Sequence, residues 1–372
     1  MPNSKSHRLR ILKKTRPLRV GFLPVNDCAP LAVACELGLF EKYDLAVELR
    51  REASWKNVND QIIHRQLDAA HAPATLPFLI NLNLTGENCV CLSGLVLSLQ
   101  GNAITISHEL WKRGVRDAKS LRDRVFRDAS KRTYAFGVVH PFSSQHFLLC
   151  QWLRSARIGP QVRILTVPPA QMFPMLKLGY LDGYCVGEPW TSVAVEAGAG
   201  VCVSTSALLA PLHPEKVLLV RQDFAQQRAD EHERLIAALL EACAFCDQPE
   251  NRPLLCELLS HPEYVDAPVD CLRSGLVGPL GPNDSRIHPL GGLNVFHRYG
   301  ANDPTVAKAA WITHHLYACF RWSRRPAGIN NVFRRDLFRR ARQIVLARDK
   351  TSAAENNDWV APALLARKAE AR

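Results

Sequence analysis

Residues 18–74 read LRVGFLPVNDCAPLAVACELGLFEKYDLAVELRREASWKNVNDQIIHRQLDAAHAPA, and residues 132–190 read RTYAFGVVHPFSSQHFLLCQWLRSARIGPQVRILTVPPAQMFPMLKLGYLDGYCVGEPW. Both stretches follow one order: a short apolar strand, a polar turn, an amphipathic helix, an alternating strand and a second helix. A Leu-Asp pair, at 67–68 and at 181–182, then precedes a strand of small residues. The repetition predicts two copies of a β-loop-α-β-α-β module with parallel strands and right-handed crossovers. We therefore predict an α/β fold with two lobes.

The loop after the first strand of each copy predicts a binding cleft between the lobes. NDCAP at 26–30 and HPFSSQH at 140–146 each lead into a helix. Ligands of such sheets bind beyond the carboxyl ends of the strands, and helix N-termini favour negative charge. An anion between the lobes fits this arrangement. A second interpretation is that the polar residues of these loops only cap their own helices; they are Asn26, Asp27, Ser143 and Ser144.

The composition narrows the class of protein. The 372-residue chain is 47% hydrophobic and carries a formal net charge of +12. Its basic residues crowd the two ends without forming a recognisable nucleic-acid-binding module, so we expect a solvated basic surface and no direct nucleic-acid binding. No apolar run reaches about 18 residues, so we expect no membrane span. The basic start lacks the apolar core of a signal peptide, which predicts a cytoplasmic protein.

Cysteine usage agrees with that expectation. The 12 cysteines are scattered through apolar segments, which is typical of buried free thiols in a reducing compartment. Cys243 and Cys246 form a CxxC, but they close a helical pattern, and neither a second CxxC nor a well-spaced histidine pair accompanies them. We interpret both as helix-packing residues. The sequence predicts no bound metal and no cofactor.

Eight segments carry a family resemblance: DCAPLAVACELGLFEKY, REASW, LDAAHAPATLP, QGNAIT, YCVGEPW, HPEKVL, DQPENRPLLCELLSHPEYVDAP and FHRYGAN. They run in one order from about residue 18 to residue 322. As an ordered set they resemble the nitrate- and bicarbonate-binding branch of the ABC transporter substrate-binding (periplasmic binding protein) superfamily. The resemblance implies a type II periplasmic-binding-protein fold, in which two Rossmann-like lobes surround a central cleft.

This fold predicts four parts of the chain. A basic N-terminal tail covers 1–17. Lobe one is discontinuous and consists of 18–107 and 217–322, whereas lobe two covers 108–216. A basic, helical C-terminal extension follows at 323–372.

The resemblance also implies ligand-binding residues. Trp55 in REASW matches a tryptophan whose indole contacts the anion, and an indole N–H suits an oxyanion because it only donates. Asn102 in QGNAIT would donate through its amide, and Lys216 in HPEKV would supply positive charge. Glu188 and Trp190 of GEPW are implied to line the cleft. Since Glu188 is itself an anion, we expect it to orient Lys216 or a histidine, or to hold backbone N–H groups.

The second loop departs from the family pattern. Relatives place a histidine directly after the paired small residues, whereas this chain has Gln145 there and His146 one position later. A glutamine can donate to an anion but cannot carry positive charge. Either Gln145 replaces the histidine, or the loop shifts and His146 reaches the ligand.

Binding without catalysis is the function that these residues predict. The implied cleft residues are donors without a paired base and nucleophile, so we expect no enzyme activity. With no export signal, the chain looks similar to cytoplasmic nitrate/nitrite sensors that control an RNA-binding antiterminator of nitrate assimilation. The alternative is the solute-binding component of a nitrate/bicarbonate ABC uptake system, with an ABC permease as its partner. The residues do not distinguish nitrate from nitrite, bicarbonate or cyanate.

Overall fold

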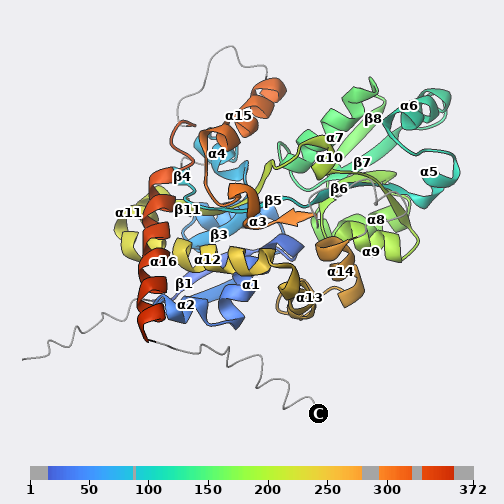
Figure 1. Ribbon diagram of the computed structural model, residues 1–372. Coiled ribbons are helices and arrows are strands. Elements are labelled where there is room, and N and C mark those ends of the chain that lie inside the picture. Colours follow the sequence, from blue (N-terminus) through green and yellow to red (C-terminus); the bar gives the residue numbers. More distant parts are fainter. Residues whose placement is uncertain (1–15, 87–88, 279–292, 321–328, 356–372) are drawn as a thin grey trace, which may run out of the picture.

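A computed structural model describes the chain except for residues 1–15, 87–88, 279–292, 321–328 and 356–372. It has two α/β lobes, one built on a seven-stranded sheet and the other on a five-stranded sheet. The second lobe, drawn in green, lies beside the first in Figure 1. The predicted fold class is confirmed. Most of the predicted N-terminal tail lies outside the described residues.

Lobe one begins with the first module and is completed after the chain returns from lobe two. Its first part contains β1 (Leu18–Phe22), a 3-10 helix (Asn26–Cys28), α1 (Ala29–Glu36), α2 (Leu39–Lys42), β2 (Val47–Arg51), α3 (Trp55–Ile63), β3 (Ala69–Pro73), α4 (Leu76–Asn81), β4 (Cys91–Leu92) and β5 (Val96–Gln100). Its second part contains β11 (Pro214–Arg221), α11 (Gln222–Gln227), α12 (Ala229–Asp247), α13 (Arg252–Leu259), α14 (Val269–Val277) and β12 (Asn294–Val295).

Lobe two is formed by one continuous stretch of chain. The C-terminal helices come after the second part of lobe one. Lobe two contains β6 (Asn102–Ser107), α5 (His108–Lys112), α6 (Ala118–Arg127), β7 (Tyr134–Val138), α7 (Ser144–Ser155), β8 (Val162–Thr166), α8 (Met172–Lys177), β9 (Gly183–Gly187), α9 (Trp190–Glu196), β10 (Gly200–Thr205) and α10 (Ser206–Leu209). The C-terminal helices are α15 (Val306–Phe320) and α16 (Arg335–Glu355).

The two modules have the same strand register. β1 pairs in parallel with β2 and β3, and β7 pairs in parallel with β8 and β9. The aspartates of the repeated Leu-Asp pair also make equivalent hydrogen bonds, each to the backbone of the first strand of its module. Asp68 accepts the backbone N–H of Arg19, and Asp182 accepts that of Ala135, both at 2.9 Å. The internal duplication predicted from the sequence is therefore confirmed.

The complete sheets are mixed, which corrects the expectation of parallel sheets. β11 runs antiparallel to β3 and β5, and β6 runs antiparallel to β9 and β10. These strands enter each sheet from the other lobe, so they need no crossover helix and can run in the opposite direction. Sheet pairing also places β6 in lobe two and all of β11 in lobe one, which differs from the predicted boundaries at 107 and 216.

The apolar core extends across the boundary between the lobes. On one face of the lobe-one sheet, α1 and α12 pack with Val20, Phe22 and Leu218. On the other face, Trp55 and its helix α3 share a cluster with Met172 of lobe two. Burying this shared surface holds the lobes against each other. The predicted C-terminal extension is helical, and its α16 crosses and packs against α12 of lobe one (Figure 1). Within the described ranges, no helix is both long and apolar enough to cross a membrane.

The chain crosses between the lobes twice, and the two crossings lie side by side. At the first crossing Gln100 and Gly101 have positive φ of 63° and 90°, and at the second Leu212 has φ 58°. The Gln100 N–H donates to the His213 carbonyl at 3.1 Å, so the crossings are bonded to each other. A Cβ on Gly101 would lie 2.1 Å from the Asn294 side chain, so a glycine is required there. The residues that follow these crossings on β6 and β11 carry the site.

Candidate anion-binding site

The start of β11 brings two charged neighbours into one buried cluster. Successive side chains of a regular strand point to opposite faces. Along β5, however, the register of β11 shifts at Lys216, on both sides of that residue. Such bulges re-aim side chains. Glu215 and Lys216 are both almost fully buried, and they bond to each other at 2.7 Å between Oε1 and Nζ.

Lys216 is held between two carboxylates. Its Nζ donates to Asp27 Oδ2 at 2.8 Å as well as to Glu215, and it lies 5.5 Å from the centre of the Trp55 ring. Burial alone would lower the pKa of Lys216, but the charges of Asp27 and Glu215 outweigh it and raise that pKa. The ammonium therefore stays charged at neutral pH, and its two carboxylate partners offset the cost of burying it.

Glu215 is the most heavily bonded side chain of the cluster. Burial would raise its pKa, but the charge of Lys216 and the bonds from His213 and Lys216 hold the pKa far below its usual range. The carboxylate therefore stays ionised and only accepts hydrogen bonds. Its donors come from both lobes: Lys216 Nζ (2.7 Å) and Gln145 Nε2 (2.7 Å) to Oε1, and Asn102 Nδ2 (2.6 Å), Ser144 Oγ (2.5 Å) and His213 Nε2 (3.1 Å) to Oε2.

Asp27 closes the cluster on the lobe-one side. It comes from the loop after β1, where it was interpreted as an anion-site or capping residue, and it contacts His71 Nε2 at 2.8 Å. Burial lowers the pKa of His71, although Asp27 acts in the opposite sense, so the ring is neutral. The Trp55 ring lies 5.6 Å from the His71 ring. The Trp55 indole N–H donates no hydrogen bond to any described residue, which leaves it available to a ligand.

The structure separates the two residues of the second loop. Gln145 faces the cluster, where its amide also donates to Asn102 Oδ1 at 2.6 Å. His146 lies on a different side of α7, with its Nδ1 3.3 Å from the Phe142 N–H and its Nε2 3.5 Å from Cys150 Sγ. Burial lowers the pKa of His146 to about 4. Ser143 caps the helix by accepting the His146 N–H at 3.2 Å.

Glu188 and Trp190 lie at a neighbouring contact between the lobes. The Glu188 carbonyl accepts the Asn26 N–H at 2.7 Å, which is a backbone bond across the lobe boundary. The Glu188 carboxylate accepts the Ser192 N–H and hydroxyl, so it holds a backbone N–H and does not orient Lys216. The side-chain amide of Asn26 and the Trp190 indole N–H are buried without a partner among the described residues. Such groups are rare in folded proteins and mark places that a polar ligand can satisfy.

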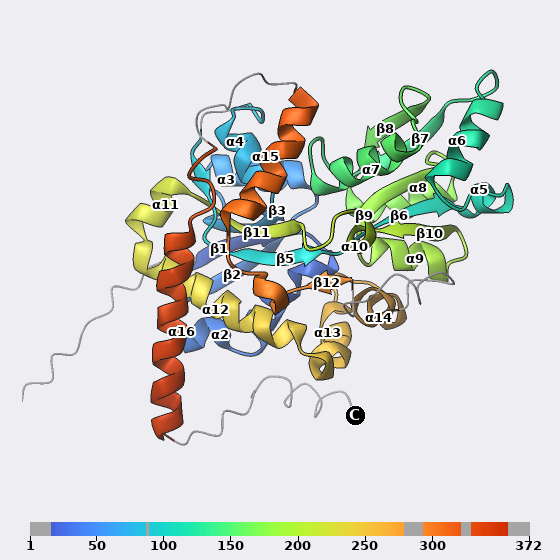
Figure 2. The same cartoon turned by 45° about the horizontal axis from the view of Figure 1, so that its top comes forward.

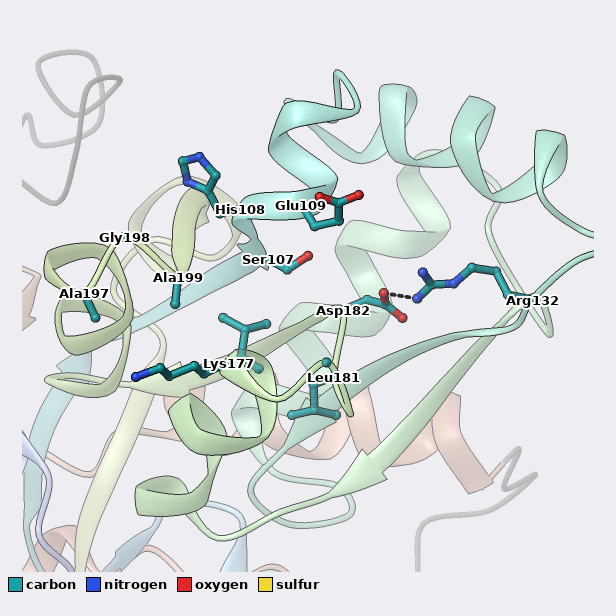
Figure 3. Close-up of a pocket in the computed structure, with 12 residues that line it drawn as sticks. Ser107, His108, Glu109, Arg132, Lys177, Leu181, Asp182, Ala197, Gly198 and Ala199 are labelled. Atoms are coloured by element: carbon teal, nitrogen blue, oxygen red, sulfur yellow. Dashed lines mark hydrogen bonds and ion pairs between the residues drawn. The ribbon is translucent and has the colours of Figure 1, made fainter.

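Two pockets show where the lobes are accessible. One, of about 400 Å³, lies between α3 of lobe one and the 140–142 loop of lobe two, with Asn59 and Thr166 among its lining residues. This pocket between the lobes is called the outer cleft below. Another, of about 420 Å³, opens on lobe two alone, where Asp182 pairs with Arg132 opposite Lys177 (Figure 3). Neither pocket is lined by any of the predicted ligand-binding residues.

Sequence reasoning missed two central groups, Glu215 and His213. Both lie in the HPEKV segment that was quoted for Lys216. A carboxylate next to a residue predicted to bind an anion is expected to repel that anion, so Glu215 was not selected. The bulge that turns its side chain into the cluster has no recognisable sequence pattern. The signal that was available is the spacing of His213, Glu215 and Lys216, three polar residues within four positions at the start of a buried strand.

Two lobes joined by paired crossings, with donors from both meeting on one carboxylate, define a two-lobed binding protein of the type II periplasmic-binding-protein fold. A family model described as the NMT1-like family matches residues 13–260, and the chain belongs to that family. The crystal structure of the periplasmic nitrate-binding protein NrtA from Synechocystis PCC 6803 superimposes with a TM-score of 0.81 at 26% identity, covering 89% of each chain.

Two relatives of known sequence extend the comparison. The nitrate/nitrite binding protein NrtA of Nostoc sp. PCC 7120 is 27% identical over 367 residues, which are 93% of this chain and 81% of that protein. The nitrate import ATP-binding protein NrtC of Synechocystis sp. PCC 6803 is 36% identical over 304 residues, 80% of this chain. The chain spans only 45% of the length of that second relative. These similarities support the nitrate- and bicarbonate-binding branch that the sequence motifs indicated.

Replacing Lys216 with methionine should lower the free energy of unfolding at pH 7 by about 3–5 kcal/mol, because two buried carboxylates lose their shared cation. In the native protein the pKa values of Asp27 and Glu215 are both lowered, so their contribution is lost only well below the ordinary carboxyl range. Without Lys216, burial raises both pKa values, and the deficit should shrink as the pH falls through that range.

Urea denaturation at pH 7 and pH 4 measures both effects. The double variant Lys216→Met/Glu215→Gln is the matched control, and it should recover part of the loss because one uncompensated charge is gone. A Lys216→Met variant as stable as the native protein at pH 7 would contradict the ion cluster.

Proposed function

We propose that this chain binds a small planar oxyanion, nitrate or nitrite, between its lobes and serves as the solute-binding component of an ABC anion import system. The observation that carries the proposal is the ring of donors on Glu215, because a carboxylate, nitrite and nitrate are all planar anions with delocalised charge. A ring that already satisfies one such anion with N–H and O–H donors has the chemistry to satisfy another.

Two further observations support the proposal. Donors from lobe one (Lys216, His213) and lobe two (Asn102, Ser144, Gln145) meet at one point, as a protein that closes around a ligand requires. The NrtA proteins of Nostoc and Synechocystis, whose names state nitrate or nitrite binding, are similar over most of the chain. The ring supplies hydrogen-bond donors and the positive charge of Lys216. We propose that the chain binds the anion without catalysing a reaction.

Replacing Trp55 with phenylalanine should weaken nitrate binding by about tenfold, because the ring is kept but the uncommitted indole donor to a charged ligand is lost. Isothermal titration with nitrate, nitrite and bicarbonate measures the affinity. Trp152→Phe is the matched control: this tryptophan packs 6.3 Å from Phe136 in the core of lobe two, away from the cluster. An equal loss in both variants would place the ligand elsewhere, and no heat with any of the three anions would refute the proposed function.

A second candidate function is a cytoplasmic sensor of nitrate or nitrite that controls an RNA-binding antiterminator. The position of α15 favours it, because this helix touches both lobes. Its Trp311 and His315 pack on Phe147 of α7 with ring centres 6.1 and 4.9 Å apart, and Trp311 also lies 5.0 Å from His213. Figure 2 shows α15 beside α7 at the top of the molecule. A movement of lobe two would therefore move α15.

The outer side of α15 is suited to contact a partner. Val306 is 85% exposed at its first turn, and a pocket of about 240 Å³ lined by apolar side chains such as Tyr317 and Phe333 runs beside the helix. A lysate pull-down with and without nitrate separates the two candidates. The import role predicts capture of an ABC permease, whereas the sensor role predicts an RNA-binding protein whose capture changes with nitrate. A sensor would be contradicted by a partner set that nitrate leaves unchanged.

A further inference from the structure

Three of the side chains predicted to bind the anion are already bound to an anion of the chain itself. Asn102, Gln145 and Lys216 each donate to the carboxylate of Glu215 at 2.6–2.7 Å. These distances are typical of hydrogen bonds to an ionised acceptor. Glu215 is 0% exposed, so water does not share these donors. An incoming oxyanion must therefore compete with Glu215 for the same groups.

The same carboxylate joins the lobes. Glu215 belongs to β11 of lobe one, and its bonds to Asn102, Ser144 and Gln145 all reach lobe two. They lie beside the crossings, where Gln100 and His213 are bonded to each other. In a two-lobed protein a ligand ordinarily supplies the bonds that favour the closed state. Here an internal carboxylate supplies them.

The charges of the cluster also indicate that an incoming anion must replace Glu215. Asp27 and Glu215 contribute two negative charges against one positive charge on Lys216, and His71 is neutral. His213 contacts two acceptors, Glu215 through Nε2 and the Ala210 carbonyl through Nδ1 at 2.9 Å. A further anion added to this set would be repelled by the adjacent carboxylate of Glu215 unless Glu215 left the ring. Exchange of one anion for the other keeps the charge of the ring unchanged.

We propose that Glu215 is a tethered substitute for the ligand, which holds the lobes together in the absence of an oxyanion and must be displaced when one binds. This inference rests on the proposed function, since it concerns the same ring of donors. It makes Glu215 a determinant of affinity and specificity. Ligands that accept from all the donors at once, as planar oxyanions do, can replace it, whereas halides with a single centre cannot.

Glu215→Gln is the direct test, because it keeps the size of the side chain and removes its charge. The variant should bind nitrate at least about tenfold more tightly than the native protein, since the donors are no longer committed to a charged acceptor. Asp27→Asn is the matched control. It removes the same charge beside Lys216 but leaves Glu215 in the ring, so its affinity should rise less than about threefold. Chloride should remain a poor ligand of all three proteins.

Glu215→Asp provides a second variant that keeps the charge. Its shorter side chain should lose the bonds to Ser144 and Gln145, and its nitrate affinity should also rise. Weaker binding by both Glu215 variants, or an equal gain in Asp27→Asn, would overturn the proposal and leave Glu215 as a residue that positions the donors.

Hydrogen exchange without any anion tests the lobe-joining role independently of binding. Amides in the first turn of α7 should exchange faster in Glu215→Gln than in the native protein or in Asp27→Asn. Unchanged exchange in Glu215→Gln would overturn the proposal. If none of the proteins bound nitrate, nitrite or bicarbonate, the proposed function would fail, and faster exchange would still establish the contact of Glu215 as the bond that joins the lobes.

Discussion

The buried carboxylate of Glu215 is the interaction on which the arrangement of this molecule depends. An ionised group taken out of water must be compensated by opposite charge and by hydrogen bonds. Glu215 meets this requirement with five donors, and three of them belong to lobe two. The distance between the lobes, the first turn of α7 and the bulge in β11 are therefore tied to one side chain. Moving any of them would leave a buried charge without its partners.

The surrounding charges extend the same constraint into lobe one. Lys216 links Glu215 to Asp27, and Asp27 fixes His71 beside the Trp55 ring. The anion chemistry thus reaches from the loop after β1 to the helix N-terminus after β7, which are the equivalent loops of the two modules. Duplication of one α/β module places these loops opposite each other, and the strands that cross between lobes supply the charges where the loops meet. A ligand that enters this region acts on both lobes and, through His213 and Trp311, on α15.

Much of this could be predicted from the sequence, because it depends on periodic patterns and on short motifs. The repeated module predicted two lobes with a site between them, and the family resemblance named Asn102, Gln145 and Lys216, which lie together in the structure. Features set by tertiary contacts could not be predicted. The antiparallel entry of β6 and β11 depends on where the chain re-enters a sheet.

The most direct measurement of the central claim is nuclear magnetic resonance of the side-chain N–H groups during titration with nitrate. The account predicts that the Trp55 indole and the Asn102 and Gln145 amides shift along one saturation curve, because they share one ligand. The ring of His146, which faces Cys150, should stay unchanged. Shifts that are confined to residues of the outer cleft, with the Asn102 and Gln145 amides unmoved at saturation, would contradict the account.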